Sequence, residues 1–191
     1  KEAVASACRV LAKRYRGQEV INLVVRVMSI PEVDNIDNDS IDDGIEYTYE
    51  KALYTEAINA LHKHGMYEEA DQLYAEGAAD GHLPWAVIED DDPSVLKLDL
   101  HGMSAAVAHS AICVSLQKET ARSSGGGGAW DKDVIVLTGT GRRSGERFRP
   151  VLTTEVQKML QLKFIPPLRA LSSQGNKATL KIPKEDIVAW F

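Results

Sequence analysis

Apolar residues recur at helical spacing through the first half of the chain. They fall three or four positions apart over residues 2–16 and 18–29, and again in two segments on either side of Gly65. This spacing gives each helix one apolar face. Pro84 closes the last of these segments because proline interrupts a helix. The pattern therefore predicts two helical hairpins within residues 1–88.

Apolar and polar residues begin to alternate at Val95, with the period of a strand that has one buried face. The apolar positions are Leu96, Leu98 and Leu100, and the polar positions are Lys97, Asp99 and His101. Gly102 then interrupts the strand, and Ser104 is a suitable cap for a helix over residues 105–118. A carboxylate and an imidazole are therefore expected side by side at the end of this strand.

Further strands and a helix are predicted in the last third of the chain. Residues 133–138 are apolar on both faces, as in a central strand. A helix is predicted from Pro150, and strands over residues 168–172 and 178–182 flank a turn at residues 175–176. The order β-α-β-α-β-β predicts a two-layer α/β domain.

Two acidic segments divide the chain. Residues 30–50 are rich in aspartate and glutamate and do not match the ligand spacing of a calcium loop. They predict a solvated insert within the helical part. The sequence EDDDP at residues 89–93 predicts a linker. The expected chain is α plus α/β, with helical hairpins over residues 1–88, this linker, and the α/β domain over residues 94–191.

Charge separates along the chain. Residues 1–97 contain 9 basic and 20 acidic side chains, a net charge of −11, whereas residues 98–191 contain 13 basic and 8 acidic ones, a net charge of +5. A nucleic-acid surface is therefore expected in the second half. No run approaches the roughly 20 apolar residues of a membrane span, so no membrane partner is expected. Cys8 and Cys113 fall in apolar helical patterns and predict small buried side chains. Because the chain begins at Lys1, we expect a fragment of a longer protein.

The second hairpin carries a specific motif. The sequence LYTEAINALHKHGMYEEADQLYAEGAADGHLP, which begins at Leu53, resembles one pentatricopeptide repeat in its tyrosine, apolar pair, central glycine, EEA and closing G-x-x-P. A shift of 50 positions aligns residues 2–29 with it as a degenerate copy. The resemblance implies the end of an RNA-binding solenoid, with Thr55 and Trp85 at the base-reading positions. Trp85 departs from the usual small polar or acidic residue, and packing at the domain junction is the alternative.

Two motifs in the second half resemble the small MutS-related (Smr) domain. They are LDLHG at residues 98–102 and LTGTGRRS at residues 137–144, with a predicted helix between them. The resemblance covers residues 95–182 and implies nucleic-acid binding and endonuclease activity. Repeats followed by this domain resemble plant organellar proteins. That implies single-stranded RNA as the partner, either organellar transcripts or ribosomal RNA precursors, and the chloroplast, or alternatively the mitochondrion, as the location.

The residues of the two motifs suit cleavage of a phosphodiester. Cleaving RNA needs a base for the 2′-hydroxyl or for water, and donors for the phosphate. We expect Asp99 and His101 to share the role of the base. Glycines let backbone N–H groups approach an anion, and arginines contact phosphates in bidentate fashion. The expected binding residues are Lys97, Gly102, Thr138, Gly139, Thr140, Gly141, Arg142, Arg143, Arg147 and Arg149. A magnesium ion at Asp99 is left open, since one carboxylate makes a weak site.

Other interpretations of these residues stay open. Asp99 can instead cap a helix or pair with an arginine, His101 can be a turn histidine, and the arginines can line a solvated loop. His109 falls on a predicted helix and is expected to be structural. Arg143 stands where Smr domains often carry histidine, which favours, as the alternative function, a module that binds RNA without cutting it. DNA nicking and protein docking are less favoured.

Overall fold

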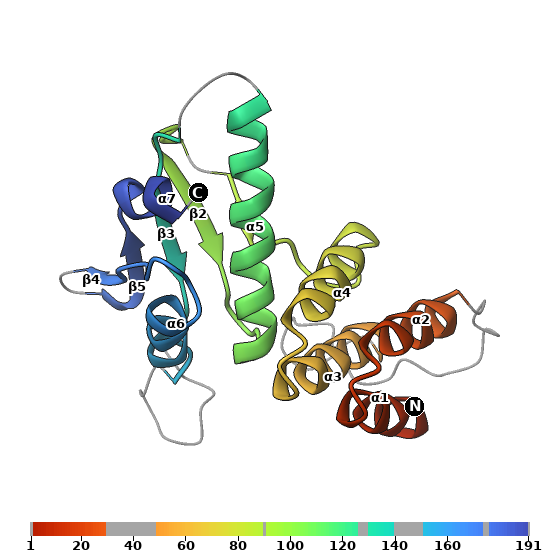
Figure 1. Ribbon diagram of the computed structural model, residues 1–191. Coiled ribbons are helices and arrows are strands. Elements are labelled where there is room, and N and C mark those ends of the chain that lie inside the picture. The colour runs from red at the N-terminus through yellow and green to blue at the C-terminus, as the bar shows by residue number, and fades with distance from the viewer. Residues whose placement is uncertain are drawn as a thin grey trace. The chain divides into compact units, whose positions relative to one another are not determined.

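The computed structural model describes residues 2–29, 49–89, 91–125, 130–139, 151–173 and 176–190. They form two compact units, Lys1–Pro84 and Trp85–Phe191, called unit 1 and unit 2 below (Figure 1). The described residues contain seven helices and one five-stranded mixed sheet, and the first four helices make up unit 1. None of the helices in the described part is long and apolar enough to cross a membrane.

Unit 1 consists of two helical hairpins. Their helices are α1 (Glu2–Lys13), α2 (Gly17–Met28), α3 (Tyr49–Lys63) and α4 (Tyr67–Ala79). α1 packs against α2 and α3, and α4 packs against α3 and α2. Each helix turns its apolar stripe toward the others, and the resulting core includes the fully buried rings of Tyr54 and Tyr74. Both hairpins expected from the sequence are therefore present, while residues 30–48 of the acidic insert lie outside the described residues.

The turns of the two hairpins share one pattern of backbone hydrogen bonds. In each turn, an amide donates to the carbonyl five residues earlier, and these pairs are Arg16 to Leu11 and Met66 to Leu61, both at 3.1 Å. The residue before each donor has a left-handed backbone, at φ 56° for Tyr15 and φ 76° for Gly65. This arrangement satisfies the last carbonyls of a helix. The hairpin backbone thus repeats at the 50-residue offset found in the sequence, although Tyr15 occupies a conformation that glycine adopts more easily.

Unit 2 is built on the sheet. Its strands are β1 (Val87–Ile88), β2 (Val95–Asp99), β3 (Asp133–Leu137), β4 (Leu171–Ser173) and β5 (Asn176–Ile182), in the spatial order β1-β2-β3-β5-β4. β2 and β3 are parallel, and the other neighbours are antiparallel. Parallel strands need a crossover connection, which α5 (Ala105–Gly125) supplies. The remaining helices are α6 (Val151–Leu162) and α7 (Lys184–Trp190).

The strands have one buried face and one half-exposed face. Leu98 and Val136 are fully buried, and α5 and α6, which contact each other, lie on one side of the sheet (Figure 1). Lys97 and Asp99 occupy alternate positions of β2 and are only partly buried. Because side chains alternate along a strand, both point to the face away from Leu98. The polar face predicted for residues 95–101 is therefore present.

The predicted order β-α-β-α-β-β is present from β2 to β5, with changes at the ends of elements. α5 continues to Gly125 instead of ending near residue 118, because no helix-breaking residue precedes that glycine. The strand expected from Leu168 begins later, since the amide of Leu168 donates to Leu160 O at 2.9 Å and turns the chain back onto α6. Gly175, in the predicted turn, lies outside the described residues.

β1 is a strand that the sequence analysis did not predict. Its two residues pair with β2, Val87 with Leu98 and Ile88 with Lys97. A strand of two residues is too short to show a periodic pattern. Residues 87–88 therefore belong to the sheet of unit 2, although they were expected to end the helical part.

Candidate active site at the ends of two parallel strands

The parallel pairing of β2 and β3 brings the two sequence motifs together. Asp99 at the end of β2 is in register with Leu137 at the end of β3, and the amide of Leu100 donates to Leu137 O at 2.8 Å. Parallel strands end at the same edge of a sheet, so the segments that follow them share that edge. Residues 98–102 and 137–139 are therefore neighbours in space.

Asp99 and His101 form a hydrogen-bonded pair at this edge. Oδ1 of Asp99 accepts the backbone N–H of His101 at 2.9 Å and also contacts Nδ1 of the His101 ring. The Asp99 side chain is 39% exposed and that of His101 is 57% exposed, so both are accessible to a ligand. Within the described part of the chain, the carboxylate pairs with this imidazole and not with an arginine.

The backbone that carries the pair is anchored, and the orientation of the imidazole is defined. The amide of Asp99 donates to Ala86 O at 2.8 Å, which anchors the end of β2 to the segment before β1. A carboxylate beside Nδ1 favours the tautomer that carries its proton on that nitrogen. Nε2 is then the acceptor, and none of the described residues forms a hydrogen bond with it. The imidazole can therefore take a proton from a ligand.

Two glycines with positive φ lie next to the pair. Gly102, at φ 72°, follows His101, and a Cβ added there would meet no atom within 4 Å outside residues 101–103. Gly139, at φ 79°, follows β3, and a Cβ added there would lie 2.9 Å from Cδ2 of His101. A Cβ at Gly139 would thus meet the imidazole, and Gly102 lets the chain turn after it. The binding roles expected for both glycines stay predictions.

Thr138 was expected to bind nucleic acid, but the structure directs it into the protein. It is 5% exposed, and its hydroxyl bonds with the hydroxyl of Thr153 on α6 and with Ala178 O, the latter at 3.1 Å. Its amide also donates to Ala178 O at 2.8 Å. Because these partners occupy the hydroxyl, Thr138 fixes the end of β3 to β5 and α6. The sequence analysis missed Thr153, because no local pattern links residues 15 positions apart.

The other candidate phosphate contacts divide into two groups. Lys97 lies two residues before Asp99 on the same half-exposed face of β2, so its side chain shares a surface with the pair. The second group lies outside the described residues and comprises Thr140, Gly141, Arg142, Arg143, Arg147 and Arg149. Their expected role in phosphate binding stays a prediction.

The two base-reading candidates belong to different units. Thr55 lies on α3 of unit 1 and is partly buried. Trp85 opens unit 2 and is 36% exposed, and Nζ of Lys118 on α5 lies 3.9 Å from the centroid of its ring. This cation–π contact packs one face of Trp85 against α5. A base-reading role for either residue stays a prediction.

A second charged cluster lies at the opposite end of β3. Oδ2 of Asp133 pairs with Nζ of Lys181, and Oδ1 accepts the amide of Lys184 at the start of α7 at 3.0 Å. Asp186 on α7 pairs with Arg169, whose amide donates to Oδ2 at 2.8 Å. The hydrogen bond from Lys181 lowers the pKa of Asp133, and that from Arg169 lowers the pKa of Asp186. The two carboxylates therefore attach α7 to the rest of unit 2.

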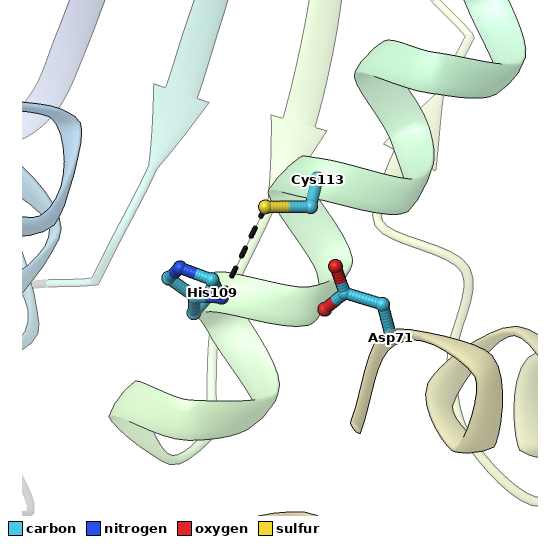
Figure 2. A group of neighbouring side chains, drawn as sticks. All are labelled: Asp71, His109 and Cys113. Carbon is cyan, nitrogen blue, oxygen red and sulfur yellow. Dashed lines mark hydrogen bonds between the residues drawn. The ribbon is translucent and has the colours of Figure 1, made fainter. Parts of the chain in front are cut away.

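Unit 2 has one further histidine, His109. It lies one helical turn from Cys113 on α5, with Nδ1 and Sγ 3.9 Å apart (Figure 2). Asp71, the third side chain in that view, lies on α4 of unit 1. His109 is 5% exposed and lies on α5, the helix predicted for it. Its expected structural role stays a prediction. In unit 1, Cys8 is fully buried, and burial raises the pKa of its thiol to about 11.

Asp99 brings few of the ligands that a magnesium ion prefers. Among the described residues, it belongs to no group of three or more potential metal-binding side chains. One of its oxygens already bonds with His101. Magnesium keeps several waters and binds through one or two carboxylates together with substrate phosphates. A metal at this edge would therefore depend on the phosphate of the ligand.

A scan against models of protein families finds no match, and a search of the curated proteins finds none either. The fold itself establishes a helical unit followed by a mixed α/β unit. The resemblance to pentatricopeptide repeats and to the Smr domain thus depends on the sequence motifs.

Proposed function

We propose that this chain is part of an RNA-processing factor in which unit 2 is an Smr-type domain that cleaves single-stranded RNA. The observation that carries the proposal is the exposed Asp99–His101 pair at the shared end of two parallel strands. Such strand ends are where α/β folds commonly place their ligands. The position of residues 137–139 beside this pair supports a common site for both motifs.

In the proposed reaction, Nε2 of His101 removes the proton of the 2′-hydroxyl, whose oxygen then attacks the adjacent phosphorus. The bond from phosphorus to the 5′-oxygen breaks, and this oxygen takes up a proton as it leaves. Asp99 holds the ring through Nδ1 and stabilises the imidazolium that forms. The cationic side chains on this part of the chain, Lys97 and the arginines of residues 142–149, neutralise the charge that develops on the phosphate.

Direct cleavage assays test the proposal. The full chain is incubated with end-labelled organellar precursor RNA, alongside His101→Ala, Asp99→Ala and the control Asp131→Ala, which removes an exposed carboxylate elsewhere in unit 2. Loss of the base should slow cleavage by roughly 10²- to 10⁴-fold, whereas the control should cleave at the normal rate. Equal cleavage by wild type and both site variants would remove the assignment.

Unit 1 is proposed to select the RNA. Two stacked hairpins with a repeating turn have the form of a short solenoid, and such solenoids present a continuous surface to a partner. Thr55 and Trp85 remain the candidate base contacts. On this proposal the natural substrate is a chloroplast transcript or ribosomal RNA precursor, with the mitochondrion as the alternative location.

A second candidate function is RNA binding without cleavage. The observation that favours it is Arg143, which stands where Smr domains often carry histidine, together with a single carboxylate at the pair. Binding would then be electrostatic, and its affinity should fall steeply between 50 and 200 mM salt without any product. Competition between single-stranded RNA and duplex DNA in the same assay decides whether DNA is a ligand.

A further inference from the structure

Gly139 lies so close to His101 that a Cβ added there would clash with the imidazole. A Cβ at Gly139 would lie 2.9 Å from Cδ2, 3.3 Å from Nε2 and 3.7 Å from Cγ of that ring. The other positive-φ glycines, at which a Cβ would meet nothing within 4 Å, are Gly65, Gly81 and Gly102. Backbone conformation alone therefore accounts for those three glycines and leaves the ring contact of Gly139 unexplained.

Hydrogen bonds fix the chain immediately before Gly139. Thr138, the residue before Gly139, donates its amide to Ala178 O at 2.8 Å, and its buried hydroxyl bonds with Thr153 and Ala178. The ring itself is held from its other edge by Asp99 through Nδ1. A Cβ at Gly139 would lie too close to Cδ2 for both groups to stay in place, so the exposed imidazole is expected to shift from its position beside Asp99.

We propose that Gly139 is a positioning residue of the candidate site, because its bare Cα is the surface on which the imidazole of His101 rests beside Asp99. This inference builds on the proposed function and assigns Gly139 a role other than the approach of its amide to an anion. Asp99 fixes one edge of the ring, and Gly139 fixes the atoms from Cδ2 to Nε2. Together they aim Nε2 at the place where the proton is removed.

A double-mutant cycle tests the contact without any assay of activity. All three tryptophans of the chain, Trp85, Trp130 and Trp190, lie in unit 2, so tryptophan fluorescence of the full chain reports the unfolding of that unit. Thermal midpoints are compared for Gly139→Ala, His101→Ala and the double variant. The single variant Gly102→Ala is the control for the strain of a positive φ, because a Cβ there would meet no atom within 4 Å outside its two chain neighbours.

Gly139→Ala is expected to lower the midpoint by roughly 2–4 °C more than Gly102→Ala does. In the His101→Ala background this excess should disappear, because the ring that meets the new Cβ is gone. Equal cost of Gly139→Ala in both backgrounds would overturn the proposal.

A measurement on the native glycine covers the case in which Gly139→Ala does not fold. The α-protons of Gly139 lie in the ring current of the imidazole, so their chemical shifts in the full chain should move when His101 is replaced by alanine. Unchanged shifts would contradict the contact.

A kinetic measurement separates positioning from packing. Gly139→Asn tolerates the positive φ but still adds a Cβ, so it should reduce kcat for RNA cleavage with little change in KM. If the wild-type protein cleaves RNA and Gly139→Asn has the same kcat, Gly139 has no positioning role. Absence of cleavage by the wild-type protein would instead overturn the proposed function, and the cycle and the chemical shifts would still report on the contact.

Discussion

Two aspartates lie on the same half-exposed face of the unit 2 sheet, at opposite ends of its parallel strands. Asp133 begins β3 and bonds with the ammonium of Lys181 and the first amide of α7. Asp99 ends β2 and bonds with the imidazole and amide of His101. The first carboxylate bonds with one cation and one backbone amide and so joins elements of the fold. The second holds a group that can exchange a proton, at an edge that a ligand can reach.

The same residue type thus serves structure at one end of the sheet and chemistry at the other. A carboxylate that pairs with lysine and caps a helix stabilises the folded state through permanent charges. A carboxylate beside an exposed imidazole adds little to stability but selects a tautomer. Four predictions test this contrast and the contacts around the site. They are given in order of decreasing effect.

Replacing each aspartate with asparagine should separate their effects on catalysis. Asp99→Asn removes the charge that orients and stabilises the imidazole, and we expect cleavage to slow by about 10²-fold or more. Asp133→Asn should leave the rate unchanged, because that carboxylate lies at the other end of β3. Single-turnover cleavage of labelled RNA measures both, and similar losses in the two variants would contradict the division of roles.

The site end of the sheet should depend on Thr138 for its stability. Thr138→Val leaves the buried hydroxyl of Thr153 without this partner, and we expect the free energy of unfolding of unit 2 to fall by about 1–3 kcal/mol. Thr179→Val on β5 is the control, since Thr179 is partly exposed, and should stay within about 0.5 kcal/mol of wild type. Urea unfolding followed by tryptophan fluorescence measures both, and equal losses would show that the Thr138 hydroxyl has no special role.

Replacing Asp133 should reduce stability more than replacing Asp99, which is the reverse of their expected order in catalysis. Asp133→Ala removes the acceptor of the Lys184 amide and should lower the free energy of unfolding of unit 2 by about 1 kcal/mol. Asp99→Ala should cost less than about 0.5 kcal/mol, because its side chain is exposed. The same urea experiment applies, and a larger cost at Asp99 would show that the pair is structural.

Acid should loosen the attachment of α7 before it affects the rest of unit 2. The pKa values of Asp133 and Asp186 are lowered in the folded state, so their stabilisation is complete above the ordinary carboxyl pKa of about 3.9. It is lost as the pH falls below that value, through the folded pKa values. Amide hydrogen exchange of Lys184–Trp190 between pH 5 and pH 3 measures the effect. The variant Asp133→Asn with Asp186→Asn should show weaker protection already at pH 5, and an unchanged profile in that variant would refute the attachment.

Much of the fold could be predicted from local patterns. Helical spacing gave both hairpins of unit 1, and the 50-residue offset reappears in the hydrogen bonds of their turns. Strict alternation from Leu96 to His101 gave β2 and its polar face. These features follow from the neighbours of each residue along the chain, and for that reason a sequence contains them. Two-residue β1 and the late start of β4 depend on distant partners and could not be predicted.

The sequence predicted the residue types at the candidate site, and the structure corrected the role of Thr138. Asp99 and His101 were expected together because they lie two positions apart on one strand face. Thr138 was expected to bind a ligand, but it is buried against Thr153 and Ala178. Nothing in the sequence near Thr138 indicates either partner, since Thr153 lies on α6 and Ala178 lies on β5.

The side chains that can perform chemistry, and the segments that become helices or strands, follow from the sequence, because both depend on residue type and short-range spacing. Which of these side chains meet depends on the folded arrangement. Parallel pairing of β2 with β3 placed Gly139 under the ring of His101, and antiparallel pairing of β5 with β3 gave Asp133 the lysine that fixes its charge. Contacts of this kind join residues far apart in the chain, and their geometry is set by strand register and helix packing instead of local preference.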